Sequence, residues 1–321
     1  FLLYPPSKKD DNWATSPVAA EKDRDHTVDF TNWVKKLLIE ESPRTVSEAQ
    51  RPDALAVWNE PNLKIFGRNP RAPANGMPWD LYSERLFEPT LKAVRSLPDP
   101  IGDMPVIGPS ASAEGPDMLP WIGRFVDRAV DNLEAWDRSH GGKDIAHDWN
   151  LSIHMYPTFQ IMAGPLFEAD AVHLLEHQDS QLINYFLSAR RMAQDNDLGD
   201  EKVWVDEWGI NAKRRSEVVG YATVPPLGQD EAARQLTGTF CKLAPLAGPM
   251  IRYTSTEDWP GTRPQTEVTK TTNWGYGAFG WEAKDPNNLG TGVVETEYPS
   301  YSTLRKAAVA PAQYCPAYLN P

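Results

Sequence analysis

Cysteine, positive charge and long apolar runs are all scarce in this sequence, and each shortage excludes a class of protein. Two cysteines in 321 residues are too few for a disulfide-rich scaffold or a cysteine-only zinc site. The 32 basic residues are outnumbered by 44 acidic ones, and the net charge of −12 opposes binding to a phosphate backbone. No apolar run approaches the roughly 18 residues of a membrane span. We therefore expect neither nucleic acid nor membrane as a partner.

The ends of the chain and its cysteines leave two questions open. The sequence starts with Phe1 and has no basic and apolar signal segment, which indicates a processed product or a fragment. Cys241 and Cys315 form either one bridge, which would tie the Pro-rich tail to a helix, or two separate thiols. We expect a secreted or extracellular location, although the cysteines do not decide the compartment.

Short apolar runs alternate with amphipathic stretches along the whole chain, and this alternation predicts the fold. The expected strands are 1–6, 54–61, 104–112, 149–157, 202–209 and 249–259, and the expected helices are 29–41, 79–97, 118–136, 180–195, 228–244 and 301–309. About six strand–helix units imply parallel strands with right-handed crossovers. A nucleotide-binding open sheet should carry a Gly-rich turn after an early strand, and none is present. The pattern thus favours an α/β fold of the closed (β/α)8 type.

Two glutamates end apolar strands beside tryptophan, and their positions suggest catalysis. Glu60 lies in "AVWNEPN" and Glu207 in "VWVDEWG", 207 − 60 = 147 residues apart with two strands between them. In a barrel, chemistry gathers at the carboxyl ends of the strands, where this spacing would place the two side chains face to face. Carboxyl groups about 5–5.5 Å apart suit double displacement at a sugar's anomeric carbon.

The motifs "WNEPN", "HMYP" and "DEWG", in that order, resemble those of the clan A retaining glycoside hydrolases. The resemblance covers about residues 1–310, and the opening segment looks most like the xylosidase/iduronidase type, family thirty-nine. It implies a (β/α)8 barrel that needs no cofactor or metal, with Glu60 as general acid/base and Glu207 as nucleophile. It also implies that Asn59 bonds the sugar 2-hydroxyl, that His154 lines the pocket, and that Tyr156 orients the nucleophile.

Aromatic side chains at strand ends would complete a sugar site. The predicted ring-covering residues are Trp58, Trp208 and Trp259, since a flat apolar face can cover a pyranose ring. Asp206, directly before the predicted nucleophile, is interpreted as a salt-bridging strand residue. The expected substrate is a plant or microbial oligo- or polysaccharide.

The front of the barrel departs from this family pattern. If "WNEPN" ends strand four, "FLLYPP" (1–6) is strand three, and strands one and two are missing. Six strands cannot close a barrel, so we expect a missing N-terminal segment or a partner chain to supply the rest. The expected organisation is a catalytic barrel over 1–310, comprising strands three to eight, and a Pro-rich tail over 311–321.

Two alternatives remain. "HLLEH" fits an inverted zincin motif in which His173 and His177 would hold zinc and Glu176 would act as general base. A catalytically silent carbohydrate-binding barrel is the other, because the front strands are missing. Hydrolysis of aryl glycosides would exclude the silent barrel, and zinc analysis would test the protease.

Overall fold

A computed structural model describes ten stretches of the chain and divides it into two compact units. The described residues are 27–41, 53–63, 76–112, 118–141, 144–155, 171–209, 229–252, 279–283, 293–297 and 299–316. Unit 1 comprises Phe1–His154 and Tyr185–Asp206, and unit 2 comprises Met155–Asn184 and Glu207–Pro321. None of the helices within these stretches combines the length and apolarity needed to cross a membrane.

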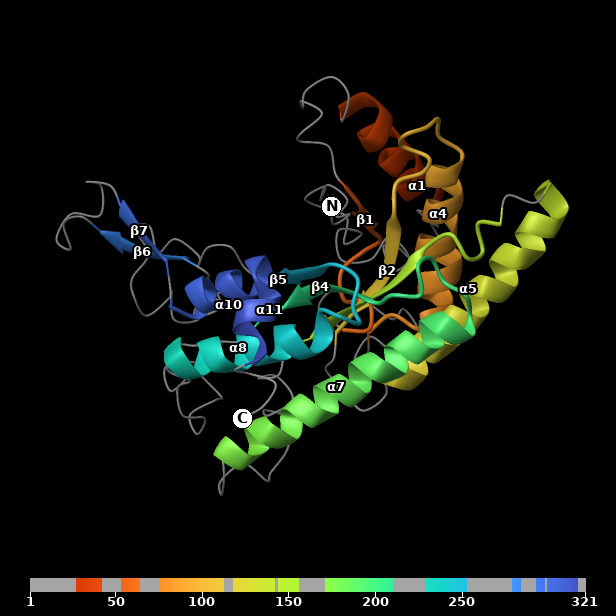
Figure 1. Ribbon diagram of the computed structural model, residues 1–321. Helices are drawn as coiled ribbons and strands as arrows, with labels where there is room; N and C mark the ends of the chain where they lie inside the picture. The colour runs from red at the N-terminus through yellow and green to blue at the C-terminus, as the bar shows by residue number, and fades with distance from the viewer. Residues whose placement is uncertain are drawn as a thin grey trace. The chain divides into compact units, whose positions relative to one another are not determined.

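The central element is a sheet whose strands follow one another in chain order. Its order is β1-β2-β3-β4-β5, with β1 Leu55–Ala56, β2 Val106–Ala111, β3 Asn150–Met155, β4 Trp204–Trp208 and β5 Met250–Arg252 (Figure 1). Strand β1 pairs with β2 in parallel, and β2 pairs with β3 in parallel. Helices therefore connect consecutive strands, as parallel pairing requires.

The helices of unit 1 follow the predicted amphipathic stretches. They are α1 Thr27–Lys36, continued by the π-helix η2 Leu37–Glu41, then α3 Trp79–Tyr82, η4 Ser83–Phe87 and α4 Glu88–Arg95, and after them α5 Met118–His140. A longer helix, α7 Ala171–Asp195, precedes β4 and begins nine residues before the predicted start at 180.

An aromatic cluster packs the helices of unit 1 against the sheet. The rings of Tyr82, Phe87, Phe125 and Trp149 lie 4.7–6.1 Å apart by centroid. All four side chains are almost completely buried. Gly108 of β2 makes room for them, since a Cβ there would lie 2.8 Å from the Phe87 ring. The site strands thus rest on a rigid apolar support.

The described residues of unit 2 include helices, strand β5 and an antiparallel hairpin. The helices are α8 Gln229–Leu243, α10 Pro299–Val309 and α11 Pro311–Tyr314, and the antiparallel strands are β6 Phe279–Ala283 and β7 Val293–Glu297. A disulfide joins Cys241 of α8 to Cys315, and Ala307 of α10 is buried beside it. The bridged alternative is therefore the one present, and it attaches the tail to α8.

The predicted alternation is confirmed in part. Strands and helices occur where the apolar runs predict them, and β1, β2 and β3 pair in parallel, as in an α/β barrel. Closure into eight strands stays a prediction, and the predicted strand 1–6 lies outside the described residues. The β6–β7 hairpin was not predicted.

Candidate active site

The "WNEPN" segment continues along β2 after β1 ends. The backbone N–H of Val57 donates to the carbonyl of Ile107 at 3.1 Å, and that of Glu60 donates to the carbonyl of Ser110 at 3.1 Å. Between these two bonds the chain departs from strand geometry, with φ of 71° at Trp58 and 41° at Glu60. Positive φ at non-glycine residues costs of order 1–3 kcal/mol each and is concentrated at functional sites. Trp58, Asn59 and Glu60 of this segment are all buried.

Asn62 fixes the end of this segment to the end of β2. Its Nδ2 donates to the carbonyl of Ser112 at 3.0 Å, and its Oδ1 accepts the N–H of Ser112 at 3.0 Å. The side chain of Asn62 thereby makes the same pair of hydrogen bonds that a neighbouring strand would make, beyond the point where the strands end.

Three titratable side chains meet at the carboxyl ends of β1, β3 and β4. Nδ1 of His154 lies 3.0 Å from Oε1 of Glu60, and its Nε2 lies 3.7 Å from Oδ1 of Asp206. The side chains are 2%, 11% and 6% exposed for His154, Glu60 and Asp206. An imidazole enclosed by two carboxylates in a dry setting can hold and orient a proton.

A bulge in β2 brings two serines to this group. The pairing of β2 with β3 shifts between Pro109 and Ala111, and Ser110 between them has a φ of 53°. Its Oγ donates to Oδ2 of Asp206 at 2.5 Å and lies 3.1 Å from Oγ of Ser152. Bulges often redirect a side chain next to an active site.

Tyr82 holds the backbone beside the site in place. Its hydroxyl donates to the carbonyl of Val57 at 2.6 Å, directly before the "WNEPN" turn. Complete burial and, secondarily, the charge of Asp206 raise the pKa of Tyr82 well above its usual 10.0. The phenol therefore stays neutral and serves as a donor.

The other predicted site residues are placed as follows. Asn59 is 6% exposed, and its Oδ1 finds no hydrogen-bond partner among the described residues. Trp58 is completely buried, with its ring edge-on to Phe30 at 5.9 Å, so it offers no open ring face. Trp208 is 3% exposed. Glu207 follows Asp206 in β4, is half-buried, and begins the second segment of unit 2.

Several predictions concern residues that the structure leaves undescribed. Tyr156 and Trp259 lie outside the described residues. The "HLLEH" motif falls in α7, but the side chains of His173, Glu176 and His177 lie outside the described part. Their roles stay predictions.

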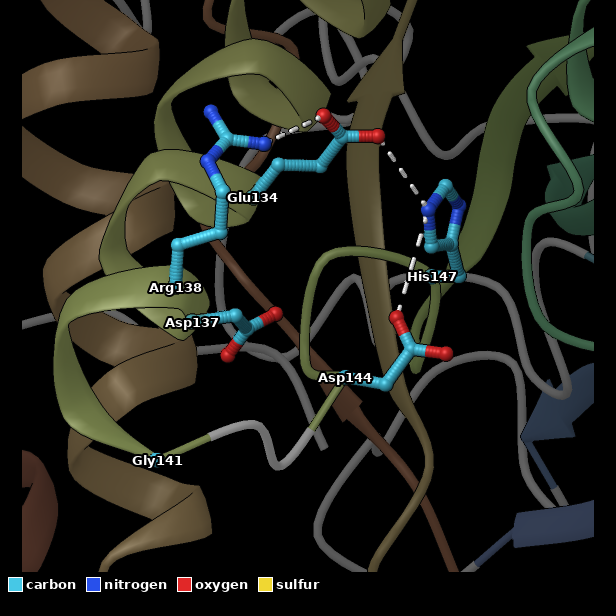
Figure 2. Close-up of a pocket in the computed structure, with 6 residues that line it drawn as sticks. All are labelled: Glu134, Asp137, Arg138, Gly141, Asp144 and His147. Carbon is cyan, nitrogen blue, oxygen red and sulfur yellow. Dashed lines mark hydrogen bonds and ion pairs between the residues drawn. The ribbon is translucent and has the colours of Figure 1, made fainter.

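A separate surface hollow lies at the other end of β3. It measures about 370 Å³ and is lined by Glu134, Asp137, Arg138, Gly141, Asp144 and His147 (Figure 2). Glu134 pairs with Arg138 at 3.2 Å and with His147 at 3.7 Å, and His147 also faces Asp144 at 3.9 Å. These contacts lie at the amino end of β3, the opposite end from Glu60, His154 and Asp206.

Comparisons with known proteins bear on the fold. The sequence matches no known family model and no curated protein. A monomeric β-xylosidase from Caulobacter crescentus CB15 is similar in structure, with a TM-score of 0.51 and 14% identity over 90% of this chain and 48% of that one. The chain is therefore similar in fold to this β-xylosidase. The resemblance inferred from the motifs is thereby confirmed at the level of fold.

Two further solved structures show weaker similarity. A GH39 enzyme from Xanthomonas axonopodis pv. citri has a TM-score of 0.49 and 15% identity over 90% of this chain and 47% of that one. An endo-laminarinase from Formosa Hel1_33_131 has a TM-score of 0.48 and 14% identity over 79% and 59%. The chain spans about half the length of the first structures that it matches.

The sequence did not predict the contacts of Ser110. Ser110 carries no recognisable motif, because its position depends on a bulge that forms only when β2 pairs with β3. Asp206 was interpreted as a salt-bridging strand residue, and its position 3.7 Å from His154 fits an ion pair. A second acid directly before the predicted nucleophile was the available signal.

Proposed function

We propose that this protein is a retaining glycoside hydrolase that cleaves O-glycosidic bonds of a plant or microbial oligo- or polysaccharide. The observation that carries the proposal is Glu60. It is a nearly buried carboxyl at the carboxyl end of a parallel strand, held 3.0 Å from His154 Nδ1. The likeness in fold to a β-xylosidase adds support.

In the proposed first step, the carboxylic acid of Glu60 gives its proton to the glycosidic oxygen as the bond to the anomeric carbon breaks. The carboxylate of Glu207 attacks the opposite face of that carbon and forms a covalent glycosyl ester. In the second step, ionised Glu60 takes a proton from water, whose oxygen displaces Glu207. Two inversions leave the configuration of the sugar unchanged, and both carboxyl groups return to their starting states.

Substrate contacts are proposed from the same end of the strands. The unpartnered Oδ1 of Asn59 adjoins Glu60 and is free to accept a sugar hydroxyl. His154 would line the pocket, Tyr156 would orient the nucleophile, and Trp259 would cover a sugar ring. Neither metal nor organic cofactor enters the proposed reaction, because both steps exchange protons and acetal bonds only.

The test is hydrolysis of a panel of nitrophenyl glycosides that begins with the β-D-xyloside. We expect turnover of at least one glycoside, and proton NMR of the first product should show the substrate's own anomer. The other anomer would disprove retention. Turnover should vanish in Glu207→Gln and persist in the exposed control Asp200→Asn. Sugar binding without turnover would instead support the silent carbohydrate-binding barrel.

A second experiment separates the two glutamates. Glu60→Ala should lose the acid/base but keep the nucleophile, so azide should restore turnover and release a glycosyl azide of retained configuration. Glu207→Ala with azide should give the inverted azide. The opposite pattern would exchange the two roles.

A further inference from the structure

We propose that Asp206 is a positioning residue for the acid/base step. Its carboxylate holds His154 as an imidazolium whose Nδ1–H binds Oε1 of Glu60, which leaves Oε2 of Glu60 to carry the transferable proton. This inference rests on the proposed role of Glu60. It assigns a function to a carboxylate that the double-displacement mechanism does not use.

The first argument is geometric. The two nitrogens of His154 face different carboxylates, at 3.0 Å for Glu60 Oε1 and 3.7 Å for Asp206 Oδ1. A neutral imidazole carries one N–H, so with Glu60 ionised it would turn a lone pair toward one of two acceptors. With a hydrogen on each nitrogen, both approaches become favourable, and the hydrogen bond to Glu60 is charge-assisted.

The second argument concerns Asp206 itself. The N–H of Ser110 donates to Oγ of Ser152 at 3.0 Å, so Ser152 can direct its own hydrogen to Oγ of Ser110, 3.1 Å away. The Ser110 hydroxyl is then left to donate to Oδ2 of Asp206. This series of bonds ends on an acceptor, and an ionised carboxylate is the form that only accepts.

The third argument is the balance of charge among buried groups. When Glu60 carries its proton, His154 and Asp206 form a neutral ion pair, which a nearly dry site tolerates. The remaining titratable neighbours in the described part are Tyr82, which stays neutral, and Glu207, which adjoins Asp206 in β4. Oδ1 of Asp206 has no hydrogen-bond partner there, so His154 Nε2 is its one polar counterpart within ion-pair distance.

These contacts determine how the proton moves. Glu60 gives the hydrogen on Oε2 to the leaving oxygen, and the negative charge that develops on Glu60 meets a fixed N–H at Oε1. The hydrogens of His154 stay in place throughout. In the second step the proton taken from water returns to Oε2. In the bond-cleaving step, the expected benefit is confined to leaving groups that need a proton.

The direct test is ¹⁵N NMR of His154 in the free protein at neutral pH, with the signal identified by its absence in His154→Gln. We expect both ring nitrogens to show the shift of an N–H nitrogen. In Asp206→Asn, Ser110 keeps the amide oxygen, so the NH₂ group faces His154, and Nε2 should change to an acceptor nitrogen. Asp200→Asn, a matched change in the exposed approach to β4, should leave the spectrum unchanged. A neutral imidazole in the unmodified protein would overturn the proposal.

Kinetics give a second readout. For aryl glycosides with poor leaving groups, kcat of Asp206→Asn should fall about 10- to 100-fold, part of the 10²–10⁴ that general acid catalysis supplies. For dinitrophenyl glycosides, which need no proton to leave, kcat/KM, which reports the bond-cleaving step, should change less than about threefold. Equal losses for all leaving groups would show a merely structural role and overturn the proposal.

The two proposals fail differently. If no glycoside is hydrolysed by the unmodified protein, the glycosidase proposal fails, while the NMR spectrum still shows whether Asp206 charges His154. If Asp206→Asn does not fold, Asp206→Glu and Ser110→Ala provide the comparison. Asp206→Glu should keep both N–H nitrogens, and Ser110→Ala should shift His154 partly toward the neutral form.

Discussion

At the scale of single residues, the site concentrates strain and buried polarity in a few positions. Three non-glycine residues near it have positive φ: Trp58, Glu60 and Ser110. Each is fixed by a backbone or side-chain hydrogen bond or by burial, so the surrounding structure supports the unfavourable conformation. We therefore expect substitution at these positions, even by a similar side chain, to lower stability.

Two buried tyrosines predict how stability depends on alkaline pH. Burial raises the pKa of Tyr82 and of Tyr185 well above 10.0. Above about pH 10 the unfolded chain loses these protons while the folded chain keeps them, so stability is full below that pH and falls as pH rises. Each tyrosine should lower the free energy of unfolding by about 1.4 kcal/mol per pH unit in this window.

Urea unfolding at pH 9 and pH 11 measures this effect. We expect the unmodified protein to lose more stability between the two pH values than Tyr82→Phe, and more again than the double variant with Tyr185→Phe. At pH 9, Tyr82→Phe should itself cost about 1 kcal/mol, because the carbonyl of Val57 loses its donor. Equal pH sensitivity in all three proteins would contradict the assignment.

The residues of the site were predictable to different degrees. Glu60, Asn59 and His154 stand in short motifs at strand ends, so their chemistry is legible in the sequence. Contacts among residues that are distant in the sequence cannot be read from it. The hydrogen bond from Ser110 to Asp206 joins positions 96 apart and depends on the bulge of β2. The burial of Trp58 likewise depends on Phe30 of α1.

At the scale of elements, each site strand is held by the helices that cover it. The aromatic cluster joins Phe87 of η4, Phe125 of α5 and Trp149 directly before β3, and the Phe87 ring packs against Gly108 of β2. Apolar periodicity predicted these elements because burial on one face imposes it. It did not predict the start of α7 or the β6–β7 hairpin.

Gly108 tests the closeness of this packing. Gly108→Ala would place a Cβ 2.8 Å from the Phe87 ring and 3.0 Å from the Tyr82 hydroxyl. We expect a loss of about 1–3 kcal/mol in the free energy of unfolding, measured in urea, from overpacking. Gly123→Ala in α5 is the control. Its Cβ would meet Met192 at 3.6 Å, an ordinary contact, so it should stabilise the helix by about 0.5–1 kcal/mol. If both variants lost stability equally, close packing at Gly108 would not be the cause.

At the scale of the whole molecule, the chain builds two compact units, and the disulfide belongs to unit 2. Cys241 and Cys315 are 74 residues apart in sequence and 5.3 Å apart by Cα. They enclose α8 beyond Cys241, β5, the β6–β7 hairpin, α10 and α11 in one covalent loop. A closed loop has fewer unfolded conformations, so the bridge stabilises mainly by limiting the unfolded state of this unit.

The bridge should therefore support one unit more than the other. Closing a loop of this length is worth about 4 kcal/mol in the chain-entropy treatment, and native bridges deliver about 2–5 kcal/mol. In Cys241→Ser/Cys315→Ser, hydrogen exchange followed by mass spectrometry should show a loss of protection of that size in peptides of α8 and α10. Peptides of α5 in unit 1 should change little. An equal loss of protection in α5 would mean that the two units unfold together. No loss of protection in α8 would mean that packing of Ala307 and Tyr314 against α8 already orders the loop without the bridge.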